Sequence, residues 1–279
     1  MKGVDQADVE RVVRAALAED LGPEGDITTL ATVDPGSTAS ARLVSRQHGV
    51  AAGLPVAAYV FDVVGEGRVH VELLVVDGDR VQPGDVLATV TGPLRALLTA
   101  ERTALNLVGH LSGVASLTRA WADAVEGTGA RVRDTRKTMP GLRALEKYAV
   151  RMGGGVNHRM SLSDAALVKD NHVVAAGGVV PAFERVRAQY PGVPLEIEVD
   201  TVEQAREVIA AGADLVLLDN MTPDAMRQVV TLTAGRARLE ASGRLSLDNA
   251  RAVAETGVDY LAVGALTHSA PVLDIGLDM

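Results

Sequence analysis

Two different rhythms of apolar and polar residues divide the 279-residue chain. Near its start, apolar residues recur with helical spacing and predict an amphipathic helix: Val9, Val12, Val13, Ala16 and Leu17. Short β-branched runs bounded by Gly, Pro and Asp then predict strands at residues 41–45, 69–76 and 86–90. Residues 93–125 carry a long helical pattern, with a break expected at Ser112 and Gly113.

From residue 130 onward, short apolar runs alternate with helical segments. Strands are expected at residues 130–134, 166–169, 195–199, 215–218, 238–241 and 260–263. Helix start signals stand at Thr201, Thr222 and Ser246, and glycine stop signals at Gly212 and Gly257. This alternation is typical of a parallel sheet with helical crossovers. No Gly-x-Gly-x-x-Gly motif follows a strand, so we favour an α/β barrel over an open, doubly wound sheet.

The expected strands are followed by residues suited to chemistry, and α/β barrels carry their active sites at these carboxyl ends. In chain order the ends carry Asp134 to Lys137, Lys169 to His172, Asp200, Asp219 with Asn220, Ser242 with Gly243, and Gly264 with Ala265. The first two ends are cationic, the middle two anionic and the last two small. Residues 131–172 contain nine Lys or Arg against four Asp or Glu. This order predicts an anion pocket, carboxylates suited to Mg²⁺ and a backbone site for phosphate.

Some of these charged residues also have a purely structural interpretation. Arg143, Lys147 and Arg151 share one helix face, which favours a solvated surface. A second polar stripe joins Arg102, Asn106 and His110, and it could equally face water.

The acidic residues of the third barrel strand admit two interpretations as well. Glu196, Glu198 and Asp200 alternate with apolar residues and therefore point into the barrel. Acids in that interior need a cation or a metal, and Lys169 could supply a structural ion pair to Glu198. His158 follows a glycine run, but with no second histidine at ligand spacing we do not expect it to bind a metal.

Composition excludes several classes of protein. The net charge is -9 and aromatic residues make up 3%, which does not favour a nucleic-acid surface. The chain has no cysteine, so disulfides and thiolate chemistry are excluded. The first helix is rich in acids, unlike a targeting peptide, and no apolar run is long enough for a membrane span. We therefore expect a cytoplasmic protein without a membrane or nucleic-acid partner.

The motifs together resemble the quinolinate phosphoribosyltransferases. The resemblance lies in DTRKTMPGLRALEKYAVR from Asp134, GGGVNHR from Gly153 and KDNH from Lys169. ERTALN from Glu101, EIEVD from Glu196, LDNM from Leu218 and EASG from Glu240 continue it in the same order. It spans nearly the whole chain and is far more specific than any single motif.

The resemblance implies a two-domain subunit of the type II phosphoribosyltransferase fold. Residues 1–112, rejoined by residues 268–279, would form an N-terminal open-faced α/β sandwich, and residues 113–267 an incomplete α/β barrel. It also implies a homodimer or larger assembly whose active sites are shared, with Arg102 lent by the partner subunit. The implied substrates are quinolinate and phosphoribosyl pyrophosphate, with Mg²⁺ as cofactor. The implied reaction is phosphoribosyl transfer with decarboxylation, which yields nicotinate mononucleotide in NAD biosynthesis.

The resemblance also assigns site residues. It matches Arg136, His158, Arg159 and Lys169 to the quinolinate pocket, and Lys137 to the pocket shared with phosphoribosyl pyrophosphate. Glu198 and Asp219 match the carboxylates beside the ribose and the metal, which they would hold through water. Ser242, Gly243 and Gly264 match the loops that bind the 5′-phosphate. We expect Lys137, Glu198 and Asp219 to be catalytic. One position departs from the family pattern, because Arg244 stands where Gly or Asn is usual.

Two other functions were weighed against this one. A paralogue of the same fold could act on another acidic acceptor, in molybdenum transport or with nicotinate, but Arg136, Arg159 and Lys169 favour a diacid. The run DGDRVQPGDVLATVTG from Asp77 resembles the half-repeat of biotinyl and lipoyl carriers. Those carriers modify a lysine on a hairpin, and no lysine lies between Lys2 and Lys137. The sequence therefore does not favour a carrier function.

Overall fold

The computed structural model describes residues 4–279, and the chain divides into two compact units. The first, called here the N-terminal unit, contains residues up to Arg119, Thr138–Gly154 and Ala265–Met279. The second, called the barrel unit, contains Ala120–Lys137 and Gly155–Gly264. The N-terminal unit thus includes residues 138–154, which the division drawn from the sequence placed with the barrel.

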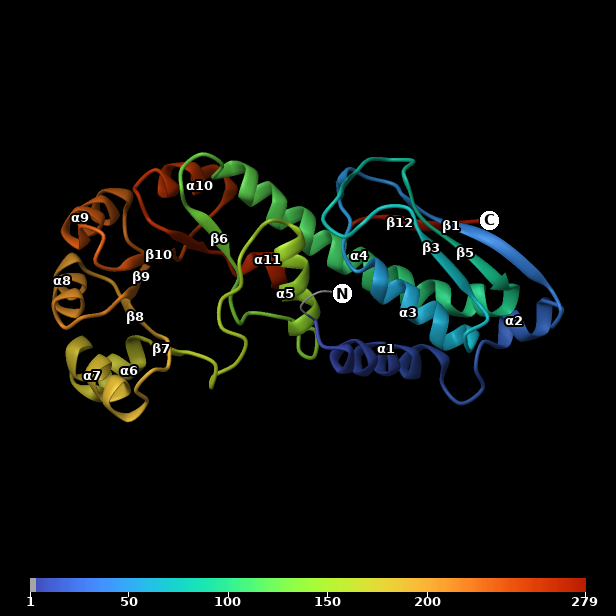
Figure 1. Ribbon diagram of the computed structural model, residues 1–279, viewed down its shortest axis with the longest axis horizontal. Helices are drawn as coiled ribbons and strands as arrows, with labels where there is room; N and C mark the ends of the chain where they lie inside the picture. Colours follow the sequence, from blue (N-terminus) through green and yellow to red (C-terminus); the bar gives the residue numbers. More distant parts are fainter. Residues whose placement is uncertain (1–3) are drawn as a thin grey trace. The chain divides into compact units, whose positions relative to one another are not determined.

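The N-terminal unit is built on a four-stranded antiparallel sheet with strand order β12-β1-β5-β3. Its strands are β1 (Thr38–Ser45), β3 (His70–Leu73), β5 (Val86–Pro93) and β12 (Ile275–Asp278), and β2 (Gly49–Val50) pairs with β4 (Arg80–Val81). The helices are α1 (Gln6–Leu21), α2 (Ile27–Thr32), α3 (Leu54–Gly65), α5 (Arg143–Met152) and α11 (Ala265–His268). Helix α3 packs against β3 and β5 (Figure 1). The last strand of the chain thereby lies beside the first, as the resemblance implies.

Helix α4 (Leu94–Ala124) runs without interruption, so the break expected near Ser112 is wrong. The Ser112 hydroxyl instead donates to the carbonyl of Ala52 and accepts from its amide, at 3.1 and 3.0 Å. Gly113 allows close packing, because a Cβ there would lie 2.0 Å from the carbonyl oxygen of Pro271. The Ser-Gly pair therefore serves contacts with other segments, and helical hydrogen bonding continues through it.

The solvated face expected on α5 is also wrong, because Lys147 is fully buried and Arg143 and Arg151 are partly buried. Helix α5 contacts both α1 and α11. Its neighbour Glu146 is also fully buried and accepts from the Met139 amide at 3.1 Å. The His110 Nε2 lies 2.9 Å from the Glu146 carboxylate. The polar stripe of Arg102, Asn106 and His110 on α4 therefore contacts the protein interior at His110. Helical spacing of charges indicates a shared face, but it does not reveal that other helices cover the face.

The barrel unit has a parallel six-stranded sheet with order β6-β11-β10-β9-β8-β7, as the alternating pattern predicts. The strands are β6 (Arg131–Arg133), β7 (Ala166–Val168), β8 (Leu195–Val199), β9 (Leu215–Asp219), β10 (Arg238–Ser242) and β11 (Tyr260–Ala262). The outer strands β6 and β7 follow each other in the chain, yet neither pairs with the other. This unpaired edge makes the barrel incomplete.

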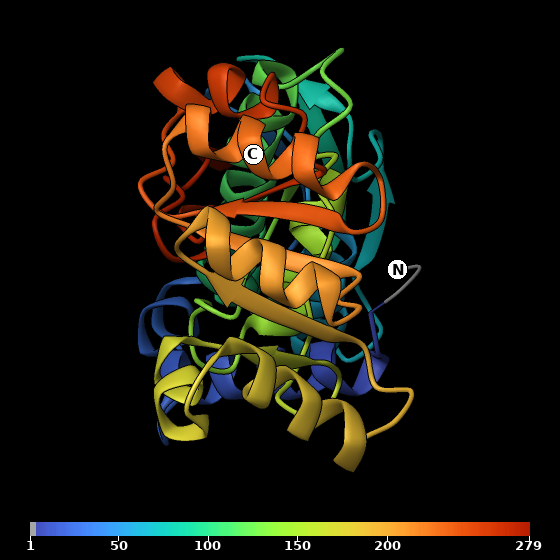
Figure 2. The same cartoon turned by 90° about the vertical axis from the view of Figure 1, so that its left-hand side faces the viewer.

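Helices connect these strands and lie on the side of the sheet turned toward the viewer in Figure 2. They are α6 (Asp170–Ala176), α7 (Val179–Gln189), α8 (Val202–Ala210), α9 (Pro223–Thr233) and α10 (Leu247–Ala254). The expected start signals are confirmed, because Thr201, Thr222 and Ser246 are the N-cap residues of α8, α9 and α10. Such caps satisfy amide groups that the first helical turn leaves without partners, and so fix where each helix begins.

Among the described residues, no helix combines the length and the apolar character needed to cross a membrane.

Candidate functional site

Four polar residues mark the carboxyl ends of adjacent barrel strands, and this set is called here the carboxyl edge. Lys169 directly follows β7, Glu198 lies near the end of β8, and Asp219 and Ser242 are the last residues of β9 and β10. The Lys169 ammonium lies 3.3 Å from the Glu198 carboxylate. Asp219 and Ser242 are paired in register. Parallel strands thus place these side chains along one edge of the sheet, as their positions in the sequence predict.

The ion pair at the carboxyl edge is open to a ligand. The Lys169 side chain is 51% exposed, whereas that of Glu198 is 12% exposed. Solvent reaches the Lys169 ammonium and screens this pair. The ion pair between Lys169 and Glu198 that the sequence allowed is therefore present. The exposed Lys169 ammonium nevertheless remains accessible to an anion.

The loop after β10 holds an unusual backbone. Gly243 has a φ of 84° and Arg244 a φ of 51°, so two successive residues are left-handed. A Cβ at Gly243 would lie 2.3 Å from the Asn220 side-chain oxygen, so only glycine fits there. Asn220 itself donates from its amide to the Ser242 carbonyl at 2.9 Å. Glycine at position 243 leaves the backbone of this loop uncovered by a side chain, which suits the close approach of a phosphate.

Arg244 occupies the position where the resembled family usually has Gly or Asn. Its left-handed backbone gives the physical reason, because Gly and Asn adopt that conformation at the lowest cost. The Arg244 side chain is exposed, and its carbonyl accepts from the Asn249 side chain at 3.0 Å.

The loop after β6 carries Arg136 and Lys137. Asp134, fully buried, accepts from the Asn157 side chain at 2.5 Å and from the His158 amide at 2.7 Å. The Lys137 amide donates to the Thr135 hydroxyl at 3.0 Å. Lys137 is exposed and Arg136 half-buried. Asp134 thus joins this cationic loop to the segment that contains His158.

Arg159 is partly buried and lies near the charge of Arg136 as well as the acids Glu196 and Asp164. Burial, and after it the positive charge of Arg136, lowers the pKa of its guanidinium. The Arg159 Nη1 donates at 2.7 Å to the carbonyl of Ala165, just before β7 begins. A carboxylate carries a full negative charge and can take two parallel bonds from a guanidinium, so an anion would compete with this carbonyl.

Four charged or polar residues fill the barrel interior and are called here the buried cluster: Arg133, His158, Glu196 and Glu240. The His158 Nε2 lies 2.7 Å from Glu196, and the Arg133 guanidinium lies 2.6 Å from Glu240. Burial raises the pKa of Glu196 to about 7. Burial, and then the negative charge of Glu196, raises the pKa of Glu240 to about 7 as well. The two carboxyl groups therefore retain a proton near neutral pH.

The buried cluster contains residues that sequence reasoning did not assign to the site. Arg133 is the last residue of β6, Glu240 lies in the middle of β10, and Asp134 was noted only as part of a strand end. A charged residue in the middle of a buried parallel strand is the signal that could have identified them, because such a charge needs a partner.

Two further residues were expected in the site, Gly264 and Arg102. Gly264 follows β11 and belongs to the barrel unit, as its expected role requires. Arg102 lies on α4 in the N-terminal unit and is exposed, as is Asn106.

Two groups of residues have the chemistry of a metal site. Glu198 and Asp219 offer partly exposed oxygen ligands on adjacent strands, which suit a Mg²⁺ ion that keeps several waters. His158, Glu196 and Glu240 have ligand atoms within 4.8 Å of one another. This second group is fully enclosed and already faces the guanidinium of Arg133, so the first group fits Mg²⁺ better.

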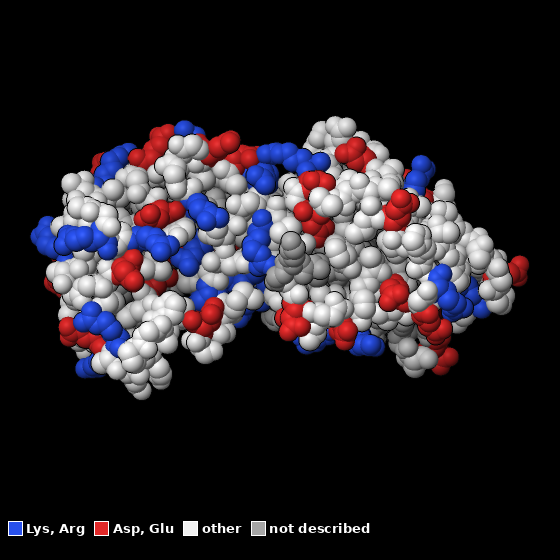
Figure 3. Space-filling view, in the orientation of Figure 1, with Lys and Arg blue, Asp and Glu red and all other residues white. Residues whose placement is uncertain are grey.

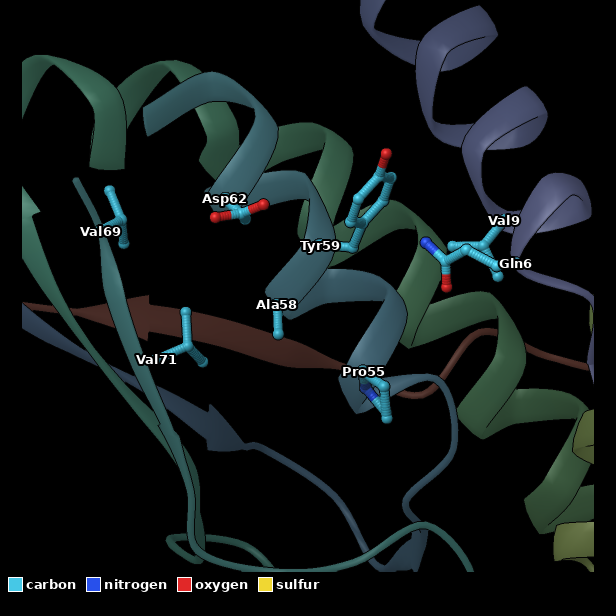
Figure 4. Close-up of a pocket in the computed structure, with 8 residues that line it drawn as sticks. All are labelled: Gln6, Val9, Pro55, Ala58, Tyr59, Asp62, Val69 and Val71. Atoms are coloured by element: carbon cyan, nitrogen blue, oxygen red, sulfur yellow. The ribbon is translucent and has the colours of Figure 1, made fainter. Parts of the chain in front are cut away.

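Surface charge agrees with a site in the barrel unit, whereas the two hollows described next do not lie at the carboxyl edge. Figure 3 shows Lys and Arg side chains gathered on the visible face of this unit. A cavity of about 260 Å³, lined by Arg133, Asn157, His158, Arg159 and Glu196 among others, lies at the amino ends of β7, β8 and β9. A hollow of about 370 Å³ in the N-terminal unit is different in character. Its lining is Gln6, Val9, Pro55, Ala58, Tyr59, Asp62, Val69 and Val71 (Figure 4). With one acid and no cation, it does not suit an anionic substrate.

Comparison with known proteins shows which domains and proteins the chain is similar to. Residues 26–112 match the N-terminal domain of quinolinate phosphoribosyl transferase, and residues 114–278 match its C-terminal domain. The chain is 55% identical over 272 residues to a nicotinate-nucleotide pyrophosphorylase [carboxylating] of Mycobacterium leprae, covering 96% of this chain and 95% of that protein. It is 41% identical to a probable enzyme of the same name from Bacillus subtilis, covering 97% and 93%. The crystal structure of NadC from Streptococcus pyogenes matches with a TM-score of 0.96 at 41% identity, covering 100% and 98%.

Proposed function

The chain belongs to the quinolinate phosphoribosyltransferase family, and from this premise we propose how its barrel residues carry the reaction. The enzyme transfers phosphoribosyl from phosphoribosyl pyrophosphate to quinolinate, with decarboxylation. The products are nicotinate mononucleotide, CO₂ and pyrophosphate, and the enzyme serves NAD biosynthesis. When CO₂ leaves, its bonding electron pair stays on the ring carbon, which then takes up a proton.

The observation that carries the assignment of residues is the pairing of Lys169 with Glu198 at the carboxyl edge. It sets a cation for a substrate carboxylate next to an anion for a developing positive charge. Arg136 and Arg159 add two guanidinium groups near enough for one to lower the pKa of the other. A ligand with two carboxylates on one ring would offset the repulsion between the two guanidinium groups. A planar guanidinium can also bind a carboxylate through two parallel hydrogen bonds. Quinolinate is such a diacid.

Glu198 and Asp219 act on the sugar. Displacement of pyrophosphate from the anomeric carbon builds positive charge on the ribose ring, as in glycosyl transfer generally. Two partly buried carboxylates on adjacent strands stabilise that charge. When bound, Mg²⁺ would be held by these carboxylates through water and would offset the charge of the departing pyrophosphate. Lys137, exposed after β6, contacts the phosphate-bearing substrate.

The loop of Ser242 and Gly243, together with Gly264, binds the 5′-phosphate. The left-handed backbone at Gly243 and the absence of side chains at both glycines leave amides accessible to phosphate oxygens. This is the part of the barrel that such folds commonly use for phosphate.

The test of the reaction is to incubate the purified protein with quinolinate, phosphoribosyl pyrophosphate and Mg²⁺ and to measure CO₂ and pyrophosphate together. We expect equal amounts of both products. A parallel incubation with nicotinate should release little pyrophosphate, because a mono-acid leaves part of the cationic pocket without a partner. Pyrophosphate release with nicotinate but not with quinolinate would contradict the proposal. EDTA should abolish turnover, and added Mg²⁺ should restore it.

Assembly and location complete the proposal. The enzyme forms a homodimer in the cytoplasm, and each active site receives Arg102 from the partner subunit. The exposed position of Arg102 on α4 supports this role. Fractionation of cells that express the natural protein tests the location.

A further inference from the structure

Asn220, the residue after β9, contacts two neighbouring parts of the proposed site. Its side-chain nitrogen Nδ2 donates to the Oδ2 of Asp219 at 2.5 Å. Its backbone amide donates to the Ser242 carbonyl at 2.9 Å. Its side-chain oxygen Oδ1 lies beside Gly243, where an added Cβ would come within 2.3 Å of it. A single residue thereby contacts the carboxylate at the end of β9 and the loop after β10.

The backbone conformation of Asn220 makes the contact with Asp219 possible. Successive side chains of an extended strand point to opposite faces, so a strand conformation at position 220 would direct the two side chains apart. Asn220 instead has a φ of 53°, in the left-handed region. Asparagine adopts this region more readily than most other residues do. The change of conformation after β9 thus lets the Asn220 side chain lie beside that of Asp219.

The orientation of the Asn220 side chain follows from its neighbours. A carboxylate can only accept hydrogen bonds, so the Asn220 amide nitrogen faces Asp219 and the Asn220 carbonyl oxygen faces Gly243. A hydrogen bond to a charged acceptor is stronger than one between neutral groups. The contact therefore restricts the rotation of the Asp219 carboxylate.

We propose that Asn220 is a positioning residue, which orients the Asp219 carboxylate and sets its spacing from the loop of Ser242 and Gly243. Asn220 then keeps the site for the ribose and the site for its 5′-phosphate at a fixed separation. The inference rests on the proposed function, which assigns these roles to Asp219 and to the loop. Such spacing matters for the rate, because a displacement of about 1 Å in an active site can cost about 100-fold.

The first test removes the side chain without straining the backbone. Asn220→Gly keeps the left-handed conformation, because glycine adopts it freely. We expect kcat to fall about 10- to 100-fold and the KM for phosphoribosyl pyrophosphate to rise, with the KM for quinolinate within about twofold of the wild type. Kinetic constants equal to those of the wild type would overturn the proposal.

Ala234→Gly is the matched control for this change. Ala234 is also exposed and left-handed, but it lies at the end of α9. We expect it to leave the kinetic constants unchanged. The Asn220 side chain is exposed as well, so Asn220→Gly should unfold in denaturant nearly as the wild type does. A loss of activity in Asn220→Gly alone would then reflect the contacts of the side chain.

Asn220→Asp separates the hydrogen bond from the shape of the side chain. Aspartate has nearly the same size and also tolerates the left-handed region. It places an acceptor and a negative charge beside Asp219, where asparagine places a donor. We expect kcat to fall at least as far as in Asn220→Gly, and wild-type turnover would contradict the proposed hydrogen bond.

A double-mutant cycle tests whether Asn220 acts through Asp219. In the Asp219→Asn background, Asn220→Gly should lose most of its effect on kcat, because the carboxylate that it orients is already gone. An equal loss in both backgrounds would mean that the two residues act independently, and would refute the positioning role.

The last test needs no substrate. Amide hydrogen exchange in the free, full-length protein should be at least about threefold faster at residues 243–246 in Asn220→Gly than in the wild type or in Ala234→Gly. Equal exchange in the three proteins would overturn the proposal. Because turnover is not involved, a wild type that does not act on quinolinate would refute the proposed function while leaving this result to decide the contact between Asn220 and the loop.

Discussion

At the scale of single residues, Glu240 carries a clear consequence for stability. It is fully buried, and its pKa is raised from 4.5 to about 7. Between these two values the folded protein keeps a proton that the unfolded chain has released. Stability from this group is therefore present below about pH 4.5 and declines as the pH rises through the window to about 7.

We expect Glu240→Gln to weaken that decline, because the amide cannot ionise. From about pH 5 to about pH 8, the free energy of unfolding of the wild type should fall by up to roughly 3 kcal/mol more than that of the variant. Denaturant unfolding at several pH values measures it. An equal decline in both proteins would mean that Glu240 is ionised throughout.

Two residues of the proposed mechanism should be sensitive to truncation. Lys137→Ala and Glu198→Ala should each reduce kcat at least about 100-fold, the loss expected for an electrostatic partner of the transition state. Glu207→Ala, which removes an exposed acid from α8, is the matched control. Turnover near that of the wild type in either variant would remove that residue from the catalytic role.

The left-handed backbone at Arg244 predicts a stabilising substitution. Asn adopts a φ near 51° more readily than Arg does, so Arg244→Asn should raise the free energy of unfolding by about 1 kcal/mol. Arg244→Ala removes the same charge but keeps the unfavourable backbone, and it should bring no such gain. Thermal unfolding of the two variants beside the wild type measures the difference, and equal midpoints would exclude relief of strain.

At the scale of elements, the contact between α4 and the segment before β12 is the tightest glycine contact in the described structure. A methyl group at Gly113 would meet the Pro271 carbonyl oxygen at 2.0 Å. To relieve this contact, either α4 or the backbone at Pro271 would have to move. We expect Gly113→Ala to lower the free energy of unfolding by about 3 kcal/mol, as overpacking at a rigid site does.

Gly36→Ala is the comparison for this change, because nothing lies within 4 Å of the added group and the backbone is not left-handed. Denaturant unfolding should separate the two variants. Equal stability would mean that α4 and the segment at Pro271 can move apart at little cost.

The elements were predicted well where a local signal exists. All six barrel strands begin and end within a few residues of expectation, because short apolar runs and capping residues are local features. The expected strand at 69–76 is shorter, since the structure ends β3 at Leu73 and a turn closes by the Val76 amide donating to Asp79. Ser112 and Gly113 were misjudged because their partners, Ala52 and Pro271, are distant in sequence.

In the candidate site, too, the residues that depend on local signals could be predicted and those that depend on distant partners could not. Lys169, Glu198, Asp219 and Ser242 could be predicted together, because strand ends of a parallel sheet share one edge. The buried cluster could not, since the pairing of Arg133 with Glu240 depends on which strands become neighbours. The burial of Lys147 likewise depends on helices that pack over α5.

At the scale of the whole molecule, the proposed sharing of active sites between the subunits of a homodimer makes a specific prediction. Arg102→Ala and Lys137→Ala homodimers should each be nearly inactive, because every site lacks one group. Mixing the two by unfolding and refolding should restore about a quarter of wild-type activity, since half of the dimers then hold one intact site of two. No recovery after subunit exchange would contradict the lending of Arg102 between subunits.

The pairing of β12 with β1 also bears on synthesis at the ribosome. Strand β1 is made early, but its neighbour Ile275–Asp278 emerges only after the entire barrel unit has been translated. Domains usually fold in order from the amino terminus as the chain grows. Here the barrel can fold first, while the edge of β1 that β12 later covers stays open to other strands. Protection of that nascent edge would then be a task for chaperones.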